Sequence, residues 1–199
     1  MIGVDAVLLG RLLDVIANDI VPLTREGVQT GNKVFGAALL RKSDLSLVLA
    51  ETNNETANPL WHGEMQCLKT FYEMPAADRP ATSDLIFLST HEPCSLCLSA
   101  ITWAGFDNFF YLFSHQDSRD SFAIPHDLNI LREVFDVQPG GYRTQNAYWQ
   151  SWSIRGEAQN AAPDVRAKLM AQIAEIEATY ESLSGTYQDS KGAADIPLA

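Results

Sequence analysis

The chain has 199 residues and a mass of 22.0 kDa, a size that predicts one compact domain. Its apolar share of 46% is enough for a substantial core and excludes an intrinsically disordered chain. It carries 14 Lys and Arg against 25 Asp and Glu, a net charge of −11. Nucleic-acid affinity depends on basic side chains that displace counterions, so this charge argues against a nucleic-acid partner.

Membrane and export signals are not apparent in the sequence. No apolar run approaches the roughly 20 residues that a membrane helix needs, and the first residues lack the basic segment of a secretory signal. The three cysteines are Cys67, Cys94 and Cys97, a set that fits metal or redox chemistry in a reducing compartment better than disulfides. We therefore expect a cytoplasmic protein with no membrane partner.

The first half of the chain predicts a helix, two strands and a second helix. Apolar residues repeat with helical spacing over residues 5–21. Residues 34–40 and 45–50 are short apolar runs separated by a polar turn, which predicts a hairpin. Residues 52–59 are polar and predict a loop, and residues 61–73 predict the next helix.

The second half continues this alternation. We expect strands at residues 85–89 and 108–113, helices at 94–104 and 128–135, and a brief strand near Val137. Strands that alternate with helices in this order are typical of a layered α/β domain with a mixed sheet.

A further helix is predicted over residues 161–184. Its apolar positions are three or four residues apart, a spacing typical of a helix that packs along another helix: Val165, Leu169, Ile173, Ile176, Tyr180 and Leu183. The partner is either the chain's own domain, over residues 1–160, or a second subunit. Residues 185–199 are interpreted as a surface tail.

Two short motifs carry candidate chemistry. His62 and Glu64 begin one predicted helix, and Cys94 and Cys97 follow Pro93 at the start of another. Cysteines three residues apart on a helix direct both sulfurs to one side, and a helix N-terminus favours the metal-binding thiolate. One imidazole and two thiolates make a three-ligand zinc set that leaves the fourth tetrahedral position for water.

A three-ligand zinc site with an open position is typical of catalysis, because the metal lowers the pKa of its water toward about 7. Glu64 is placed to move a proton from that water to a leaving amine. A C-x-x-C alone could be a redox pair or two core cysteines, and an isolated H-x-E is common by chance. Together and in this order, they match the H-x-E…P-C-x-x-C signature of zinc deaminases.

On these residues, the chain resembles the cytidine deaminase superfamily in its cytidine and deoxycytidylate deaminase zinc-binding region, over about residues 35–122. The resemblance implies a three-layer α/β/α sandwich around a five-stranded mixed sheet, here with an extra C-terminal helix. It makes residues 1–160 a zinc deaminase domain with an N-terminal helix, and it implies a homodimer.

The second motif indicates a branch of that superfamily. His62 stands where free cytidine deaminases typically have a cysteine, and the run EPCSLCLSAITWAG is similar to that of bacterial guanine deaminases and tRNA adenosine deaminases. The resemblance implies that Phe35 stacks on a flat base and that Asn53 hydrogen-bonds it. The loop before His62 is shorter than in that branch, so the register between Asn53 and Asn54 stays open.

The resemblance also suggests acidic substrate contacts. Asp120, in a D-S-F run, is the first candidate for reading a purine edge, and Asp117 is the second. The alternative for both is a solvated acidic loop. Glu92 precedes Pro93 and is either a substrate contact or a helix cap.

We therefore expect a zinc-dependent hydrolytic deaminase that releases ammonia from a free nucleobase, a guanine-like purine or a related amino-heterocycle. One alternative is a cytidine, cytosine or dCMP deaminase of the same superfamily. An alternative of another class is a non-catalytic, zinc-stabilised binding module. The sequence leaves the base and the oligomeric state open.

Overall fold

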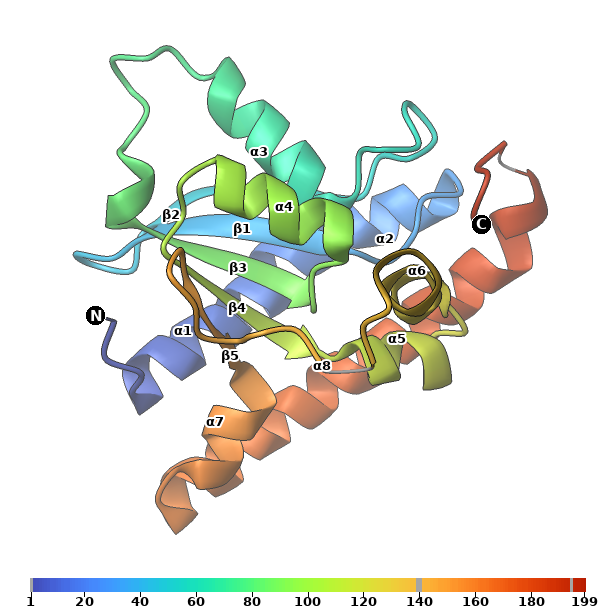
Figure 1. Cartoon of the computed structure of the whole chain (residues 1–199). Helices are drawn as coiled ribbons and strands as arrows, with labels where there is room; N and C mark the ends of the chain where they lie inside the picture. The colour runs from blue at the N-terminus through green and yellow to red at the C-terminus, as the bar shows by residue number, and fades with distance from the viewer. Residues whose placement is uncertain (1, 139–140, 194) are drawn as a thin grey trace.

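A five-stranded sheet forms the centre of the computed structural model, which describes residues 2–138, 141–193 and 195–199 (Figure 1). The strand order is β2-β1-β3-β4-β5. The strands are β1 (Gly36–Arg41), β2 (Leu47–Thr52), β3 (Leu85–His91), β4 (Asn108–Phe113) and β5 (Gln150–Ser153). β1 is antiparallel to β2 and β3, whereas β3, β4 and β5 are parallel, so the predicted mixed sheet is confirmed.

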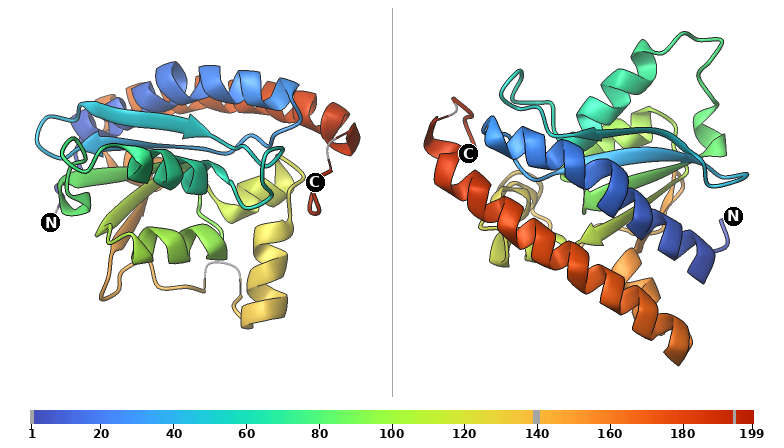
Figure 2. Two further views of the ribbon diagram at one scale, coloured as in Figure 1. Left: turned by 90° about the horizontal axis from the view of Figure 1, so that it is seen from above. Right: turned by 180° about the vertical axis from the view of Figure 1, so that it is seen from behind.

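Helices cover both faces of the sheet, as the edge-on view in Figure 2 shows. One face carries α3 (Gly63–Glu73) and α4 (Ser95–Trp103). The other carries α1 (Ala6–Val15), α2 (Val21–Gln29), α7 (Ile154–Asn160) and α8 (Pro163–Ser190). This confirms the predicted three-layer α/β/α sandwich with an added C-terminal helix.

The central strands are apolar on both sides because each side packs under helices. In β1, Ala37 and Leu39 belong to the core under α3 and α4, while Ala38 and Leu40 belong to the core on the opposite face. Successive side chains of a strand point to opposite faces, so a doubly covered strand appears as a continuous apolar run. That run is the signal by which the sequence predicts this strand.

The N-terminal helical segment is longer than predicted. α1 passes through a π-helical turn (Ile16–Ile20) into α2, which ends at Gln29, whereas the apolar pattern predicted an end at residue 21. Pro22 lies at the start of α2 and has no N–H to donate to the preceding turn. The widened π turn just before it accommodates that missing bond, so the chain continues as a helix.

The C-terminal segment also differs from its prediction. Within the stretch interpreted as a surface tail, α8 continues to Ser190, Tyr187 is fully buried and Ile196 is 7% exposed, so part of the described stretch packs on the domain. The apolar spacing of Tyr180 and Leu183 simply extends by one turn to Tyr187. α8 lies alongside α1, α2 and α7 of its own chain (Figure 2).

Three short elements beside the sheet complete the fold. α5 (His115–Asp120) and α7 were not predicted, while α6 (His126–Phe135) matches its prediction within two residues. The strand expected near Val137 is wrong: α6 ends at Phe135, the next residue, Asp136, has a left-handed conformation, and the fifth strand is β5. No helix in residues 2–138, 141–193 and 195–199 is long and apolar enough to span a bilayer.

Candidate metal centre

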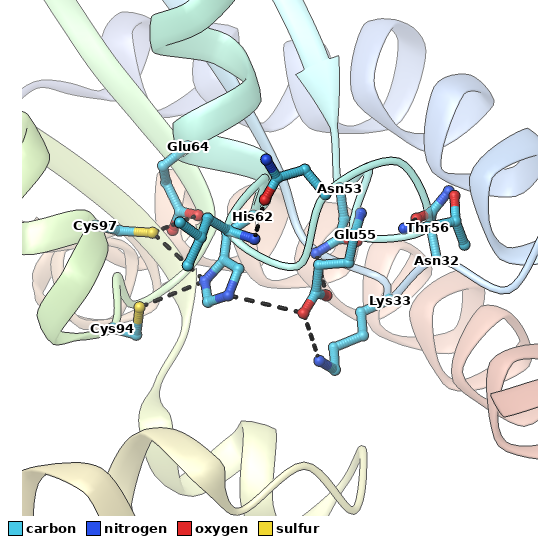
Figure 3. A network of polar contacts seen from close by, with 11 residues as sticks. Asn32, Lys33, Asn53, Glu55, Thr56, His62, Glu64, Cys94 and Cys97 are labelled. Carbon is cyan, nitrogen blue, oxygen red and sulfur yellow. Dashed lines mark hydrogen bonds and ion pairs between the residues drawn. The ribbon is translucent and has the colours of Figure 1, made fainter. Parts of the chain in front are cut away.

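The two sequence motifs meet where β3 ends. His62 is the residue before α3, and Cys94 is the residue before α4, so both helices present their N-termini at this point. Cys97 lies one turn into α4 and faces the same way as Cys94. α3 and α4 also contact each other, which brings the imidazole and the two thiols into one cluster (Figure 3).

Gly63 allows α3 to start unusually close to β1. A Cβ atom at Gly63 would lie 2.7 Å from Gly36 Cα and 2.8 Å from Phe35 O, well inside normal contact distance. Because Gly63 separates His62 from Glu64, this close approach sets the height of both side chains over the sheet.

The donor atoms have the spacing of a tetrahedral zinc site. His62 Nδ1 lies 3.4 Å from Cys94 Sγ and 3.7 Å from Cys97 Sγ, and all three donors lie within 4.8 Å of one another. With zinc–nitrogen and zinc–sulfur bonds of about 2.0 and 2.3 Å, tetrahedral geometry separates neighbouring ligands by about 3.6 Å. The residues present therefore fit a zinc ion bound through Nδ1 and two sulfurs.

The ionisation of the cluster favours a bound cation. The hydrogen bond from Cys97 and the His62 imidazole hold the pKa of the Cys94 thiol well below its usual range, against the effect of burial. Burial lowers the pKa of His62, but Cys94, Glu55 and Glu64 outweigh it and raise this pKa to about 9. Burial and the neighbouring Cys94 raise the pKa of Cys97, so a second thiolate forms readily only with a metal ion present.

Glu64 joins the cluster from the first turn of α3. Its Oε2 lies 3.4 Å from Cys97 Sγ, and its Oε1 accepts a hydrogen bond of 2.7 Å from the Ser89 hydroxyl. Burial raises the pKa of this carboxyl group, so it can take up a proton more readily than an exposed glutamate. Ser89, on β3, was not predicted as part of the site.

Asn53 lies next to the cluster but is already hydrogen-bonded. It is 1% exposed, and its Nδ2 donates to Glu55 Oε2 over 2.7 Å while its Oδ1 accepts from the Glu55 N–H (Figure 3). Its predicted hydrogen bond to a base stays a prediction, since that bond would use the remaining amide hydrogen or lone pair.

Phe35 is a core residue in this structure. The residue is 9% exposed, and its ring packs edge-to-face against His91, with 4.7 Å between the ring centres. Its predicted stacking on a base stays a prediction, since the ring face that His91 contacts is already covered. The residue directly precedes β1 and points into the layer covered by α1 and α8.

Glu92 acts as a helix cap, the alternative considered for it, although the helix is α5 rather than α4. Its Oε2 accepts the N–H of His115, the first residue of α5, over 2.9 Å. The Tyr142 hydroxyl donates to its other oxygen. Glu92 is buried between the second motif and α5.

The side chains of Asp117 and Asp120 both interact with other residues of α5 or with its N-cap. Asp117 forms a capping box with Ser114, and its Oδ2 accepts the Ser114 N–H over 2.7 Å. Asp120 is paired with Arg119, and its side chain is 61% exposed. Because α5 turns Asp120 outward to Arg119 at the surface, its predicted contact with a base is not formed by this geometry alone and stays a prediction. The S-x-x-D pattern at residues 114–117 was the signal for the helix.

Asp127, which sequence reasoning missed, lies near the cluster instead. It is in the first turn of α6 and is half-buried. Burial and the negative charge of Cys94 raise the pKa of its carboxyl group to about 7, with Glu64 adding to the effect. Nothing in its local sequence indicates this position, since it depends on how α6 packs beside α4.

Known proteins are similar to this chain in sequence and in fold. The family model described as "Cytidine and deoxycytidylate deaminase zinc-binding region" matches residues 18–113. The guanine deaminase of Bacillus subtilis (strain 168) is 31% identical over 104 residues, which are 51% of this chain and 64% of that protein. The match therefore spans slightly less than two thirds of this curated relative.

Solved structures agree with the fold. An X-ray structure of guanine deaminase from Bacillus subtilis is 26% identical, covers 75% of this chain and 95% of its own, and has a TM-score of 0.51. A structure of NE0047 in complex with 2,6-diaminopurine is 15% identical, covers 95% and 92%, and has a TM-score of 0.50. The second likeness shows the fold alone. The matched region, residues 18–113, spans both motifs, so this chain is similar over just under half of its length to the cytidine and deoxycytidylate deaminase zinc-binding region.

Proposed function

We propose that this chain is a zinc-dependent hydrolytic deaminase of a free nucleobase, with a guanine-like purine or a related amino-heterocycle as substrate. The observation that carries the proposal is the placement of Glu64 against a three-donor zinc set, 3.4 Å from Cys97 Sγ. The His62 side chain is 24% exposed, so the cluster is open on one side. A metal held only for structure would need no such carboxyl group.

His62 Nδ1 and the sulfurs of Cys94 and Cys97 would hold the zinc ion. When bound, zinc supplies a Lewis acid that makes a water molecule nucleophilic near neutral pH. Glu64 accepts a proton from the attacking water through the oxygen that faces the cluster, while Ser89 keeps the other oxygen in place. Glu64 then returns a proton to the departing amine. The base gains a carbonyl oxygen from water as the carbon–nitrogen bond breaks, and ammonia leaves.

The choice of a guanine-like base rests on the relatives named guanine deaminase. Their printed activity concerns those proteins, and its transfer to this chain is part of the proposal. Within this chain, we assign the contact with the base to Asp127 in place of Asp120. Its carboxyl group can pair with the N–H and amino donors of a purine edge.

An ammonia-release assay tests this function. The zinc-loaded protein is incubated with guanine, adenine, cytosine, cytidine, dCMP and an aminotriazine, and ammonia is measured for each. The proposal expects release from guanine or another free amino-heterocycle. Release only from cytidine or dCMP would support the nucleoside or nucleotide alternative. No release from any of them would favour a non-catalytic zinc-stabilised module.

A homodimer in a reducing, cytoplasmic environment is part of the same proposal. Exposed aromatic side chains gather near the end of α4: Trp103 is 90% exposed and Tyr72 is 48% exposed, with the Tyr72 hydroxyl donating to Ala104 O. Apolar surface of this kind is often covered by a second subunit. Light scattering of the native chain and of Trp103→Ser tests the homodimer. We expect the native chain to be a dimer and the substitution to weaken it.

The three free cysteines fit the reducing compartment.

A further inference from the structure

A buried ion pair lies beside the metal centre and has no role in the proton transfer proposed for Glu64. Lys33 Nζ and Glu55 Oε1 are 2.7 Å apart, and their side chains are 5% and 3% exposed. Removing two charges from water is costly, and a buried pair of this kind often contributes little net stability. Its presence therefore raises the question of what else it does.

Glu55 connects this pair to a zinc ligand. Its Oε1, which pairs with Lys33, lies 3.7 Å from His62 Nε2 (Figure 3). Its Oε2 accepts a hydrogen bond of 2.7 Å from Asn53 Nδ2. The contact with His62 is electrostatic at this distance, and a shift of about half an ångström would make it a hydrogen bond. The opposite ring nitrogen, Nδ1, faces Cys94 and Cys97.

The segment that carries Glu55 is fixed at several points. The Asn53 N–H donates to Phe35 O over 2.7 Å, and the Asn54 N–H donates to Trp61 O over 2.8 Å. The Thr56 N–H donates to Asn32 Oδ1 over 2.9 Å, which ties the segment to the loop that bears Lys33. The carboxylate is therefore held from both sides and cannot follow the imidazole if the ring turns.

We propose that Glu55, held by Lys33 and Asn53, is a positioning residue for the zinc ligand His62. A carboxylate beside Nε2 favours the tautomer with its proton on that nitrogen. The lone pair of Nδ1 is then free to face the metal. A partner on the second nitrogen of a zinc-bound histidine orients the ring and raises its basicity. Lys33 holds the carboxylate in place. The inference rests on the zinc site of the proposed function and adds to it the residues that hold one of its ligands, His62, in position.

The test replaces the pair by a neutral one of similar size, Lys33→Met with Glu55→Gln, so that no charge is left buried alone. Zinc affinity is measured by competition with a chromogenic chelator. We expect the double variant to bind zinc about 10–100-fold more weakly, the effect typical of losing such a partner. The matched control is Lys42→Met with Asp107→Asn, an ion pair of 2.7 Å at the opposite end of the sheet, which should leave zinc affinity unchanged.

A second variant covers the case in which the double variant does not fold. Glu55→Asp keeps the charge for Lys33 but withdraws the carboxylate from His62, and it should also weaken zinc binding at least tenfold. Thermal unfolding in a chelator should then change little. Wild-type zinc affinity in a folded variant would overturn the proposal, and so would an equal loss in the Lys42 and Asp107 control.

Zinc affinity is independent of turnover, so the two proposals fail separately. If the native chain deaminates no base but the Glu55 variants lose zinc, the proposed function fails and the positioning role stands. If the variants keep both zinc affinity and native deamination of a base, the positioning role fails and the function stands.

Discussion

The two motif segments, residues 62–64 and 94–97, contrast with the segment from residue 114 to 135 that forms α5 and α6. In the motif segments, the predicted side chains face one another with the spacing of zinc ligands. In the second segment, Asp117 caps its own helix, Asp120 points to solvent, and an unpredicted residue, Asp127, lies near the cluster. The positions of the three zinc ligands follow from where α3 and α4 begin. The positions of the candidate substrate contacts depend instead on how α5 and α6 pack.

Removing a zinc ligand should have the largest effect on the two motif segments. Cys97→Ala takes one of two sulfurs from the donor set, and we expect zinc affinity to fall by several orders of magnitude, since thiolate bonds supply much of the binding energy. Metal content after gel filtration measures it. Cys67→Ala is the matched control, because Cys67 is buried in α3 away from the cluster. Stoichiometric zinc in Cys97→Ala at native affinity would contradict the assignment.

The close approach of α3 to β1 provides a second test in the same region. Gly63→Ala places a Cβ atom 2.7 Å from Gly36 Cα, and we expect a loss of about 1–3 kcal/mol in the free energy of unfolding, together with weaker zinc binding. Urea denaturation and chelator competition measure the two effects. Gly10→Ala in α1 has open space around its Cβ, and the free energy of unfolding should rise slightly. Equal behaviour of both variants would mean that the close approach is unimportant.

The success of the sequence prediction follows the same division. Continuous apolar runs predicted β1, β3 and β4 within two residues, because strands covered on both sides need them. His62, Cys94 and Cys97 were predictable because each lies at or near the start of a helix. There, the spacing of residues along the sequence determines the direction in which their side chains point. Phe35 was not, since its burial depends on the packing of α8, which lies far along the chain. The Lys33–Glu55 pair has no local signal, because the two residues meet only through the folded loops.

In the segment that forms α5 and α6, the proposed contact with the base depends on Asp127. Asp127→Asn should raise the KM for the base about tenfold and leave zinc content unchanged, because it removes one charged hydrogen-bond acceptor worth about 1.5 kcal/mol. Steady-state kinetics with each base measure it. Asp120→Asn is the control and should have native kinetics, since that carboxyl group is paired with Arg119 at the surface. The reverse pattern would restore Asp120 as the residue that contacts the base.

His91 links the two regions, since its ring packs against Phe35 beneath the motifs and against Phe122 just after α5. Burial lowers its pKa from 6.5 to about 3. Below pH 6.5, the unfolded chain therefore binds more protons at His91 than the folded chain does. Above that pH, His91 is neutral in both states and does not lower the free energy of unfolding. We expect a loss of about 1.4 kcal/mol per pH unit as the pH falls below 6.5.

Urea denaturation of the wild type and of His91→Phe between pH 5 and 8 measures this effect. The part of the pH dependence that belongs to His91 should be absent from the variant, whose ring fits the same aromatic surroundings. Parallel pH profiles for the two proteins would show that the buried imidazole does not carry it.

The most direct test of the central claim compares Glu64→Gln with the native chain at equal zinc content. The claim is that the three-donor cluster binds the metal and that Glu64 moves the proton. The variant should bind one zinc ion per chain with native affinity, yet release ammonia from the preferred base at least about 100-fold more slowly. Native turnover by the zinc-loaded variant would contradict the claim.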